Sequence, residues 1–234
     1  MTPTGGRTRA VRTHGEIVAD PALLDAVVDQ VLLPSFSTDE IWDRDTTRDL
    51  VVAGALTATA LVEDGIVLGA SAEERGGPGE VGLLSYLASR PGSRSRGVGG
   101  ELLDHLVADW ARGPAALVVG EVHDPRLWPE ADDERPAARL RFYARHGARL
   151  LDLPWVQPAL TPGRAPVPGM LLITLHPLGG THVESAPVRR WIEAYTGDEP
   201  APEVEPVLRR LGRRPTLETL DVDDLARIKP LPSP

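Results

Sequence analysis

The sequence contains no cysteine, and only 4% of its 234 residues are aromatic. Without a thiol, the chain can form no disulfide framework, thiolate zinc site or iron–sulfur cluster, and it has no cysteine nucleophile. Because aromatic residues are so few, leucine, valine, isoleucine and alanine must fill the core. No apolar run approaches the ~20 residues that span a bilayer, and the first dozen residues lack the apolar segment of a secretory signal. We therefore expect a cytoplasmic protein that does not bind a membrane.

Positive charge is in the minority. The chain has 25 lysine and arginine residues against 34 aspartate and glutamate residues, which gives a formal net charge of −9 at pH 7. An acidic chain disfavours nonspecific binding to nucleic acid or an anionic membrane, and it favours cationic small molecules as partners. The 6 histidines do not show the helical or hairpin spacing of metal ligands, so we expect no metal.

Hydrophobic periodicity predicts a helix followed by an antiparallel meander. Asp20 and Pro21 form a helix start, and the apolar residues that follow, up to Leu32, recur at helical spacing. Strand-like runs come next, over residues 55–62, 66–72 and 81–88, joined by short turns rich in glycine. Turns of this length place neighbouring strands antiparallel.

Helices and strands then alternate along the chain. The pattern predicts an amphipathic helix over residues 98–110 and a strand over residues 115–123 that opens with a continuous apolar run. Because a helix connects them, we expect this strand to pair parallel with the strand over residues 81–88. The next predicted elements are one helix and two strands, over residues 137–146, 148–153 and 170–176.

The composition divides the chain into segments. We expect residues 1–14 to form a mobile arm and residues 15–180 to form one domain. Residues 181–234 are expected to form a helical appendage, packed on the domain or on a partner subunit, with helices over residues 187–195, 203–211 and 217–228. The predicted fold class is α/β, with a mixed, mainly antiparallel central sheet flanked by helices.

A cluster of glycine and arginine, RSRGVGG at residues 94–100, lies between a predicted strand and a predicted helix. Backbone N–H groups at a helix start point outward, and glycines let a diphosphate approach them closely. The cluster lacks the Gly-Lys-Ser/Thr of a nucleotidase loop, and Leu102 stands where a dinucleotide fingerprint needs a third glycine or alanine. Two interpretations stay open: a phosphate cradle, or a turn with solvated arginines.

Two segments resemble the GNAT superfamily of acyl-CoA-dependent N-acyltransferases. Residues 87–99, LASRPGSRSRGVG, resemble its acyl-CoA signature, whose core is (Gln/Arg)-x-x-Gly-x-(Gly/Ala). Residues 141–148, RFYARHGA, resemble its late helix, usually Phe-Tyr-x-x-x-Gly-Phe. The segments occur in the family's order with a predicted strand between them, and the resemblance covers roughly Asp20 to Leu178.

The resemblance implies acetyl-CoA as co-substrate and a sheet that is splayed between its fourth and fifth strands. The pantetheine arm would pair with the backbone of the fourth strand, and the pyrophosphate would lie on the loop amides. The residues implied in cofactor binding are Leu87, Ala88, Ser89, Arg94, Ser95, Arg96, Gly97, Val98, Gly99 and Gly100.

The resemblance also implies a general acid. Tyr143 matches the family's tyrosine that protonates the departing CoA thiolate. The alternative is a residue that only packs on an amphipathic helix, and Phe142 beside it is expected to pack in the core.

The general base is less defined, because Leu83 stands near the position where some members carry a carboxylate. Glu121 is the first candidate, and Glu80 and His123 are the others. The alternatives are that each is a solvated strand-end residue, or that water accepts the proton.

The expected reaction is transfer of an acetyl group from acetyl-CoA to a primary amine by direct attack in a ternary complex, since no cysteine or serine elbow is present to carry the acyl group. The acceptor is expected to be a small-molecule or peptide amine, in a pocket shaped by residues 23–32, 37–48 and 153–169. We also consider a homodimer. The alternative functions are a catalytically silent acyl-CoA-binding or sensing module, and a structural domain whose glycines only form turns.

Overall fold

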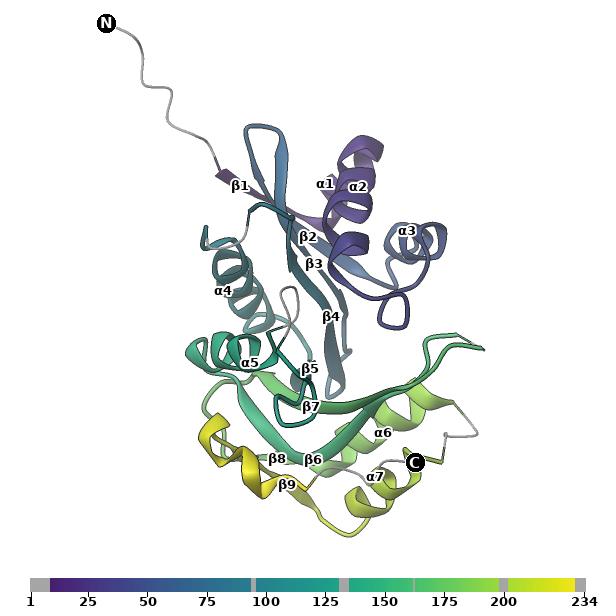
Figure 1. The fold of residues 1–234 in the computed structure, drawn as a ribbon, viewed down its shortest axis with the longest axis vertical. Helices are drawn as coiled ribbons and strands as arrows, with labels where there is room; N and C mark the ends of the chain where they lie inside the picture. Colours follow the sequence, from purple (N-terminus) through teal and green to yellow (C-terminus); the bar gives the residue numbers. More distant parts are fainter. Residues whose placement is uncertain (1–8, 94–95, 131–134, 162, 198–201, 230–234) are drawn as a thin grey trace, which may run out of the picture. The chain divides into compact units, whose positions relative to one another are not determined.

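The structure is a computed structural model that describes residues 9–93, 96–130, 135–161, 163–197 and 202–229 (Figure 1). The chain divides into two units, one formed by Met1–Glu74 with Leu84–Leu106 and the other by Arg75–Leu83 with Val107–Pro234. Strand β4 (Val81–Ser89) and helix α4 (Val98–Trp110) contribute residues to both. The predicted fold class is confirmed, because the sheet structure is mainly antiparallel, with β4 and β5 (Leu117–His123) as a parallel pair, and helices flank it.

In the first unit the strand order is β1 (Arg9–Arg12), β2 (Thr57–Glu63), β3 (Ile66–Glu74) and the second part of β4. β2 and β3 pair antiparallel, which confirms the predicted hairpin. The prediction that residues 1–14 form a mobile arm is wrong for the last of these residues, because Arg9–Arg12 pair with the edge of β2 and His14 begins a helix. An unpaired strand edge offers backbone hydrogen bonds that a short neighbouring segment can complete.

The helices of the first unit are α1 (His14–Ala19), α2 (Pro21–Val27) and α3 (Arg44–Val52). The predicted helix from Asp20 to Leu32 is confirmed, with a wider π-helical turn over Val28–Leu32 and a short 3-10 turn over Leu33–Ser35. Asp20 fixes its start, because its carboxylate accepts hydrogen bonds from the N–H groups of Ala22 and Leu23. The buried stripe of this helix packs in one core with β2, β3 and β4.

Gly69 in β3 lets α4 pack closely on the sheet. A Cβ atom at this position would lie 2.8 Å from the carbonyl oxygen of Ala88 and would also press on the side chains of Val98 and Leu102. Val98 and Leu102 are buried with apolar side chains of β2 and β3. Only glycine at position 69 leaves room for these two side chains. Gly69 therefore allows the start of α4 to pack closely against β3 and β4.

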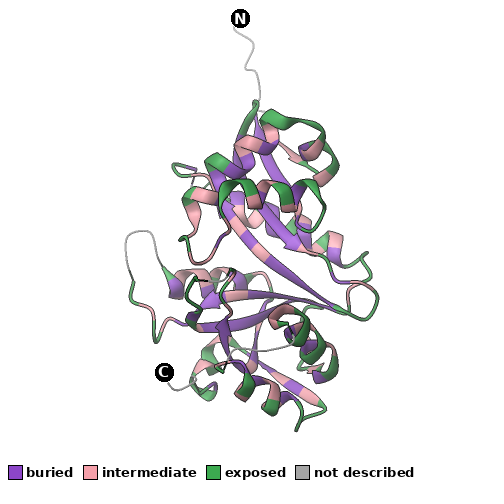
Figure 2. Cartoon of the chain, turned by 90° about the vertical axis from the view of Figure 1, so that its right-hand side faces the viewer, coloured by how far each residue is buried: buried purple, intermediate pink, exposed green. Residues whose placement is uncertain are grey.

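In the second unit the strand order is the first part of β4, then β5, β7 (Val167–His176), β6 (Arg149–Gln157), β9 (Thr216–Leu220) and β8 (His182–Glu184). The predicted parallel pairing of β5 with β4 is confirmed. Helix α5 (Pro136–Arg145) is the helix predicted over residues 137–146. Helices α6 (Ser185–Thr196) and α7 (Glu205–Leu211) share a core with β5, β6 and β7, and Figure 2 shows these strands as largely buried.

The prediction of a purely helical C-terminal extension is wrong. Residues 216–220 form β9, which pairs antiparallel with β6, and a 3-10 turn over Val222–Arg227 follows. The large apolar residues of this segment recur mainly at helical spacing, at 217, 220, 225 and 228, and pairing with the free edge of β6 overrides this local pattern. Ion pairs also hold the extension on β6, since Asp152 of β6 pairs with Arg210 at 2.7 Å and with Arg214 at 2.8 Å. The extension therefore packs on the sheet of its own unit.

Across the described ranges, none of the helices combines the length and the apolar character needed to cross a membrane.

The close contact at Gly69 can be tested by substitution. We expect Gly69→Ala to lower the free energy of unfolding by about 1–3 kcal/mol, because the methyl group forces α4 away from the sheet. Chemical denaturation measures this difference. The control is Gly15→Ala in α1, where an added Cβ meets no atom within 4 Å and should be neutral or slightly stabilising. Equal unfolding free energies for the two variants would contradict the close approach.

Candidate functional site

The end of β4 and the start of α4 have features of a backbone anion site. β4 continues its pairing up to Arg90, whose N–H donates to the Leu68 carbonyl at 2.8 Å. Gly97 has a φ of +76°, a backbone conformation that residues with a side chain rarely adopt. Its carbonyl accepts a hydrogen bond from the Glu101 N–H at 3.0 Å, and this bond begins α4. The N–H groups of the first turn, from Val98 onward, have no partner within the helix, and the helix dipole places partial positive charge there.

Most of the residues predicted to bind the cofactor lie together in the first unit. Arg94 and Ser95 lie outside the described residues. The others end β4, precede α4 or form its first turn, and are Leu87, Ala88, Ser89, Arg96, Gly97, Val98, Gly99 and Gly100.

Arg96 takes part in an ion-pair network that the sequence pattern did not indicate. Its guanidinium donates to one carboxylate oxygen of Glu63 at 2.5 Å, and Arg9 donates to the other oxygen at 2.8 Å. Arg9 also bonds Glu101 of α4 at 3.0 Å. Hydrogen bonds from Arg9 and Arg96 lower the pKa of Glu63, so its carboxylate stays ionised. The two cations and the two carboxylates of this network balance each other in charge, and the N–H groups at the start of α4 add an attraction for an anion that does not depend on side chains.

An aromatic cluster covers β4 in the same unit. The ring of Tyr86 lies 5.0 Å from that of Phe36 and 6.4 Å from that of Trp42, measured between centroids. The Tyr86 hydroxyl donates to the Glu40 carbonyl at 3.2 Å. The loop with Trp42 therefore packs on the strand whose end carries the predicted cofactor contacts, and its role in acceptor binding stays a prediction.

Tyr143 lies on the buried side of α5 in the second unit. Its side chain is 9% exposed, and this burial raises the pKa of Tyr143 to about 12, with Arg139 acting in the opposite direction. The phenol therefore stays protonated throughout the physiological pH range and keeps a proton to donate in a hydrogen bond. The prediction that Phe142 packs in the core is wrong, because this residue is half-buried, and its ring lies against Tyr143 and His146 near the helix end.

The three candidate bases differ in their surroundings. Glu80 accepts a hydrogen bond from the Gly77 N–H at 2.8 Å in an exposed turn. His123 is buried and stacks on Trp128, with ring centroids 4.0 Å apart. Glu121 is half-buried and accepts a hydrogen bond from the indole N–H of Trp155 at 2.6 Å. Of the three, Glu121 combines partial exposure with a fixed carboxylate.

Glu74, at the end of β3, is a carboxyl that the sequence pattern did not single out. Burial raises the pKa of Glu74 above its ordinary value. A carboxylate of this kind accepts a proton nearer to neutral pH than a solvated one does. The sequence hardly distinguishes Glu74, because this residue directly follows Glu73 at the end of an apolar run.

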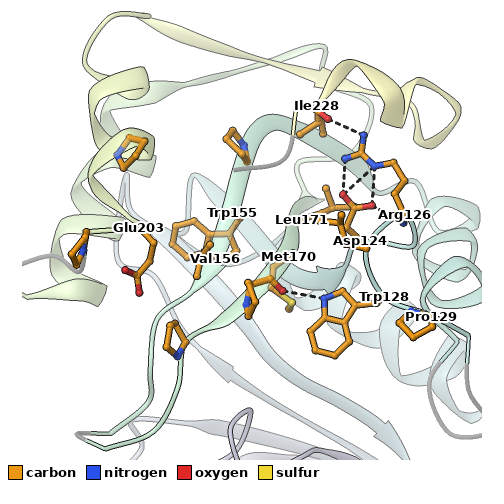
Figure 3. Close-up of a pocket in the computed structure, with 17 residues that line it drawn as sticks. Asp124, Arg126, Trp128, Pro129, Trp155, Val156, Met170, Leu171, Glu203 and Ile228 are labelled. Carbon is orange, nitrogen blue, oxygen red and sulfur yellow. Dashed lines mark hydrogen bonds and ion pairs between the residues drawn. The ribbon is translucent and has the colours of Figure 1, made fainter. Parts of the chain in front are cut away.

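A large pocket lies in the second unit, at the end of β5 (Figure 3). Its volume is about 910 Å³, and its lining comes from the segment after β5, from β6 and β7, and from the C-terminal extension. The buried carboxylate of Asp124 pairs with Arg126 at 2.5 Å, and Arg126 also donates to the carbonyls of Leu225 and Ile228. The Trp128 indole donates to the Pro168 carbonyl at 3.0 Å. Part of the segment 153–169, predicted to shape an acceptor pocket, therefore lines a real cavity.

The predicted residues thus form two groups. The cofactor residues belong to the first unit, whereas Tyr143, Glu121 and the pocket belong to the second. In the residues that the structure describes, no three histidine, aspartate or glutamate side chains gather as they would around a metal ion.

No protein-family model and no curated protein matches the chain. Solved structures match its fold. A GNAT-family protein from Bacteroides thetaiotaomicron is 21% identical, with a TM-score of 0.55 over 71% of this chain and 85% of that chain. An aminoglycoside 6′-acetyltransferase type Ii is 16% identical, with a TM-score of 0.50 over 73% of this chain and 98% of that chain. The chain therefore has the GNAT fold, as the resemblance of its sequence implied.

The burial of Tyr143 predicts a late titration. The protein has 3 tyrosines, and we expect the ultraviolet absorbance of phenolate to show one of them ionising near pH 12. The free energy of unfolding should also fall as the pH rises from about 10 to about 12, because the unfolded chain loses this proton first. Tyr143→Phe should remove the late absorbance step. A late step that survives in this variant would contradict the assignment.

Proposed function

We propose that the protein is an N-acetyltransferase that moves an acetyl group from acetyl-CoA to a primary amine in a ternary complex. The observation that carries the proposal is the β4–α4 segment, where Gly97 and the first turn of α4 present backbone N–H groups beside the end of a strand. The GNAT fold, which the chain shares with an aminoglycoside acetyltransferase, supports the same class of reaction.

The described residues fit the phosphates of acetyl-CoA. A Cβ atom added at Gly97 would meet no atom within 4 Å, so the backbone here is open to a ligand. The diphosphate would bind the N–H groups of Gly97–Gly100, and Arg96 would share its guanidinium between Glu63 and a phosphate. The pantetheine arm would pair with the backbone of residues 87–89 as an added strand does.

In the proposed reaction the amine nitrogen bonds to the thioester carbonyl carbon, the carbon–sulfur bond breaks, and the released thiolate takes up a proton from water. A backbone N–H of β4 near Leu87 would stabilise the carbonyl oxygen. The proposed role of Tyr143 is to donate a hydrogen bond to the departing sulfur. An alkyl thiol has a pKa of about 8.5, so complete transfer from a phenol of pKa about 12 would be uphill by about 5 kcal/mol. Stabilisation of the sulfur by hydrogen bonding avoids most of that cost.

Glu121 is the proposed acceptor for the amine proton. It lies on β5, the parallel neighbour of β4, and Trp155 fixes its carboxylate at one oxygen. In the proposal this carboxylate accepts the proton from the ammonium group, directly or through a bridging water. Glu74 is the second candidate because burial raises its pKa.

The proposal predicts thiol release that depends on an acceptor. With acetyl-CoA and a chemically diverse set of amines, the protein should release free CoA, and mass spectrometry should find an acetylated product. Gly99→Asp should weaken CoA binding at least about tenfold, because it adds bulk and negative charge beside the phosphates. Ala108→Asp, an exposed position on the same helix, is the control for the change in charge.

The outcomes also separate the alternative functions. CoA at ~100 times its Kd should stabilise the protein by ~2.7 kcal/mol against thermal unfolding. Stabilisation without acceptor-dependent thiol release would contradict the enzyme and support a silent acyl-CoA-binding module. If CoA does not stabilise the protein and no thiol is released, the result supports a structural domain, in which the glycines of the loop only form a turn.

Tyr143→Phe tests the proposed donor. We expect kcat to fall about 100-fold, while the Kd for acetyl-CoA changes less than about threefold, because the phenol hydrogen bond forms only as the sulfur departs. Steady-state kinetics and calorimetry measure the two quantities. Tyr195→Phe on α6 is the matched control. An unchanged kcat would remove Tyr143 from the reaction.

A further inference from the structure

The C-terminal extension forms one side of the pocket in Figure 3. Pro202, Glu203 and Ile228 belong to the extension, whereas Trp128 follows β5 and Trp155 lies on β6. The volume of about 910 Å³ falls within the range of small-molecule sites, and most of the lining is proline, tryptophan and aliphatic side chain. The pocket therefore suits a ligand with a sizeable apolar body.

The charges at the pocket favour a cation. Asp124 and Arg126 compensate each other in charge, and two backbone carbonyls accept hydrogen bonds from Nη1 of Arg126. Glu203 is half-buried, and no described residue forms a hydrogen bond or an ion pair with it. Among the described residues, the negative charge of Glu203 thus has no ion-pair partner, and Trp128 and Trp155 line the same pocket. A carboxylate and aromatic rings in one pocket attract organic ammonium groups.

The extension holds Glu203 in a defined position. Val204 and Val207, which follow it, are buried in the core of the second unit. The ion pairs of Asp152 with Arg210 and Arg214 tie the end of α7 and the residues after it to β6. A backbone anchored in this way keeps Glu203 at the pocket, so less conformational entropy of the chain is lost when a ligand binds.

The pocket is also connected to the proposed base. Trp155 lines the pocket, and its indole N–H donates to Glu121 at 2.6 Å. Asp124, another lining residue, follows β5 directly, three positions after Glu121. A molecule in the pocket therefore contacts the side chain that orients the Glu121 carboxylate.

We propose that this pocket binds the acceptor amine as an organic cation with an apolar, ring-containing body, in preference to a hydrophilic polyamine. The body lies against Trp128 and Trp155, and Glu203 attracts the cationic group. That the ligand is an acceptor rests on the proposed acetyltransfer, whereas its binding in the pocket does not.

Binding can be measured apart from catalysis with phenethyltrimethylammonium, a cation that cannot be acetylated. Calorimetry should detect its binding at millimolar concentration. Glu203→Gln should weaken the binding about fivefold, in line with loss of one partly exposed charge pair. Glu205→Gln, an exposed glutamate two residues away that does not line the pocket, is the control and should leave the binding unchanged.

Trp128→Leu tests the apolar wall. We expect it to weaken binding about tenfold, because an aliphatic side chain removes the cation–π attraction and part of the contact area. Thermal unfolding identifies a variant that has lost its fold, and the Glu203→Gln result does not depend on this variant. No binding of the probe to the unaltered protein, or equal binding by Glu203→Gln and Glu205→Gln, would overturn the proposal.

Turnover separates this proposal from the proposed function. With acetyl-CoA, phenethylamine should give a higher kcat/KM than putrescine, and Glu203→Gln should reduce that advantage. Binding of the quaternary probe without turnover of any amine would contradict the acetyltransferase and leave the pocket as a cation site. Turnover of putrescine in preference to phenethylamine would support acetyltransfer and overturn the choice of acceptor.

Discussion

The packing of α4 on β3 at Gly69 sets the geometry on which the candidate cofactor site depends. Val98 and Leu102 occupy the space that a side chain at Gly69 would fill, so the helix axis lies close to the sheet. The first turn of α4 then begins next to the end of β4, and Gly97 supplies the positive φ that the change of direction needs. A shift of the helix by the width of a methyl group would move the N–H groups away from the strand end that is proposed to bind the same ligand.

The electrostatics of the site differ from those of the whole chain. A net charge of −9 repels the phosphates of a nucleotide at long range, and the four side chains Arg9, Glu63, Arg96 and Glu101 balance each other. Backbone N–H groups at a helix start attract anions without a net charge, and they do not titrate. The same acidic surface favours approach of a cationic acceptor. The two proposed substrates can therefore be attracted by different means, the phosphates by local dipoles and the amine by the overall field and by Glu203.

Local patterns predicted the elements, and long-range contacts decided what the patterns could not. The helix starting at Asp20, the hairpin of β2 and β3 and the helix of Tyr143 follow from periodicity and end signals within a few residues. β9 did not, since the apolar residues of its segment recur mainly at helical spacing and pairing with the free edge of β6 overrides that pattern. The resemblance of two short segments located Tyr143 and the glycine loop, whereas the partners of Arg96 lie 33 and 87 residues away in sequence and form no motif with it. The pocket could not be predicted from the sequence either, because its walls come from separate segments that only the folded sheet and the extension bring together.

The C-terminal extension couples recognition to folding. β9 covers the edge of β6, which would otherwise expose unpaired backbone groups, and the following turn supplies the carbonyls that hold Arg126 beside Asp124. The same extension brings Glu203 to the pocket through the buried side chains of Val204 and Val207. The solved structures of this fold match 71% and 73% of the chain, so more than a quarter of it has no counterpart in them. Recognition that depends on the extension follows from this chain's own residues, and the acceptors of proteins that share only the fold do not determine it.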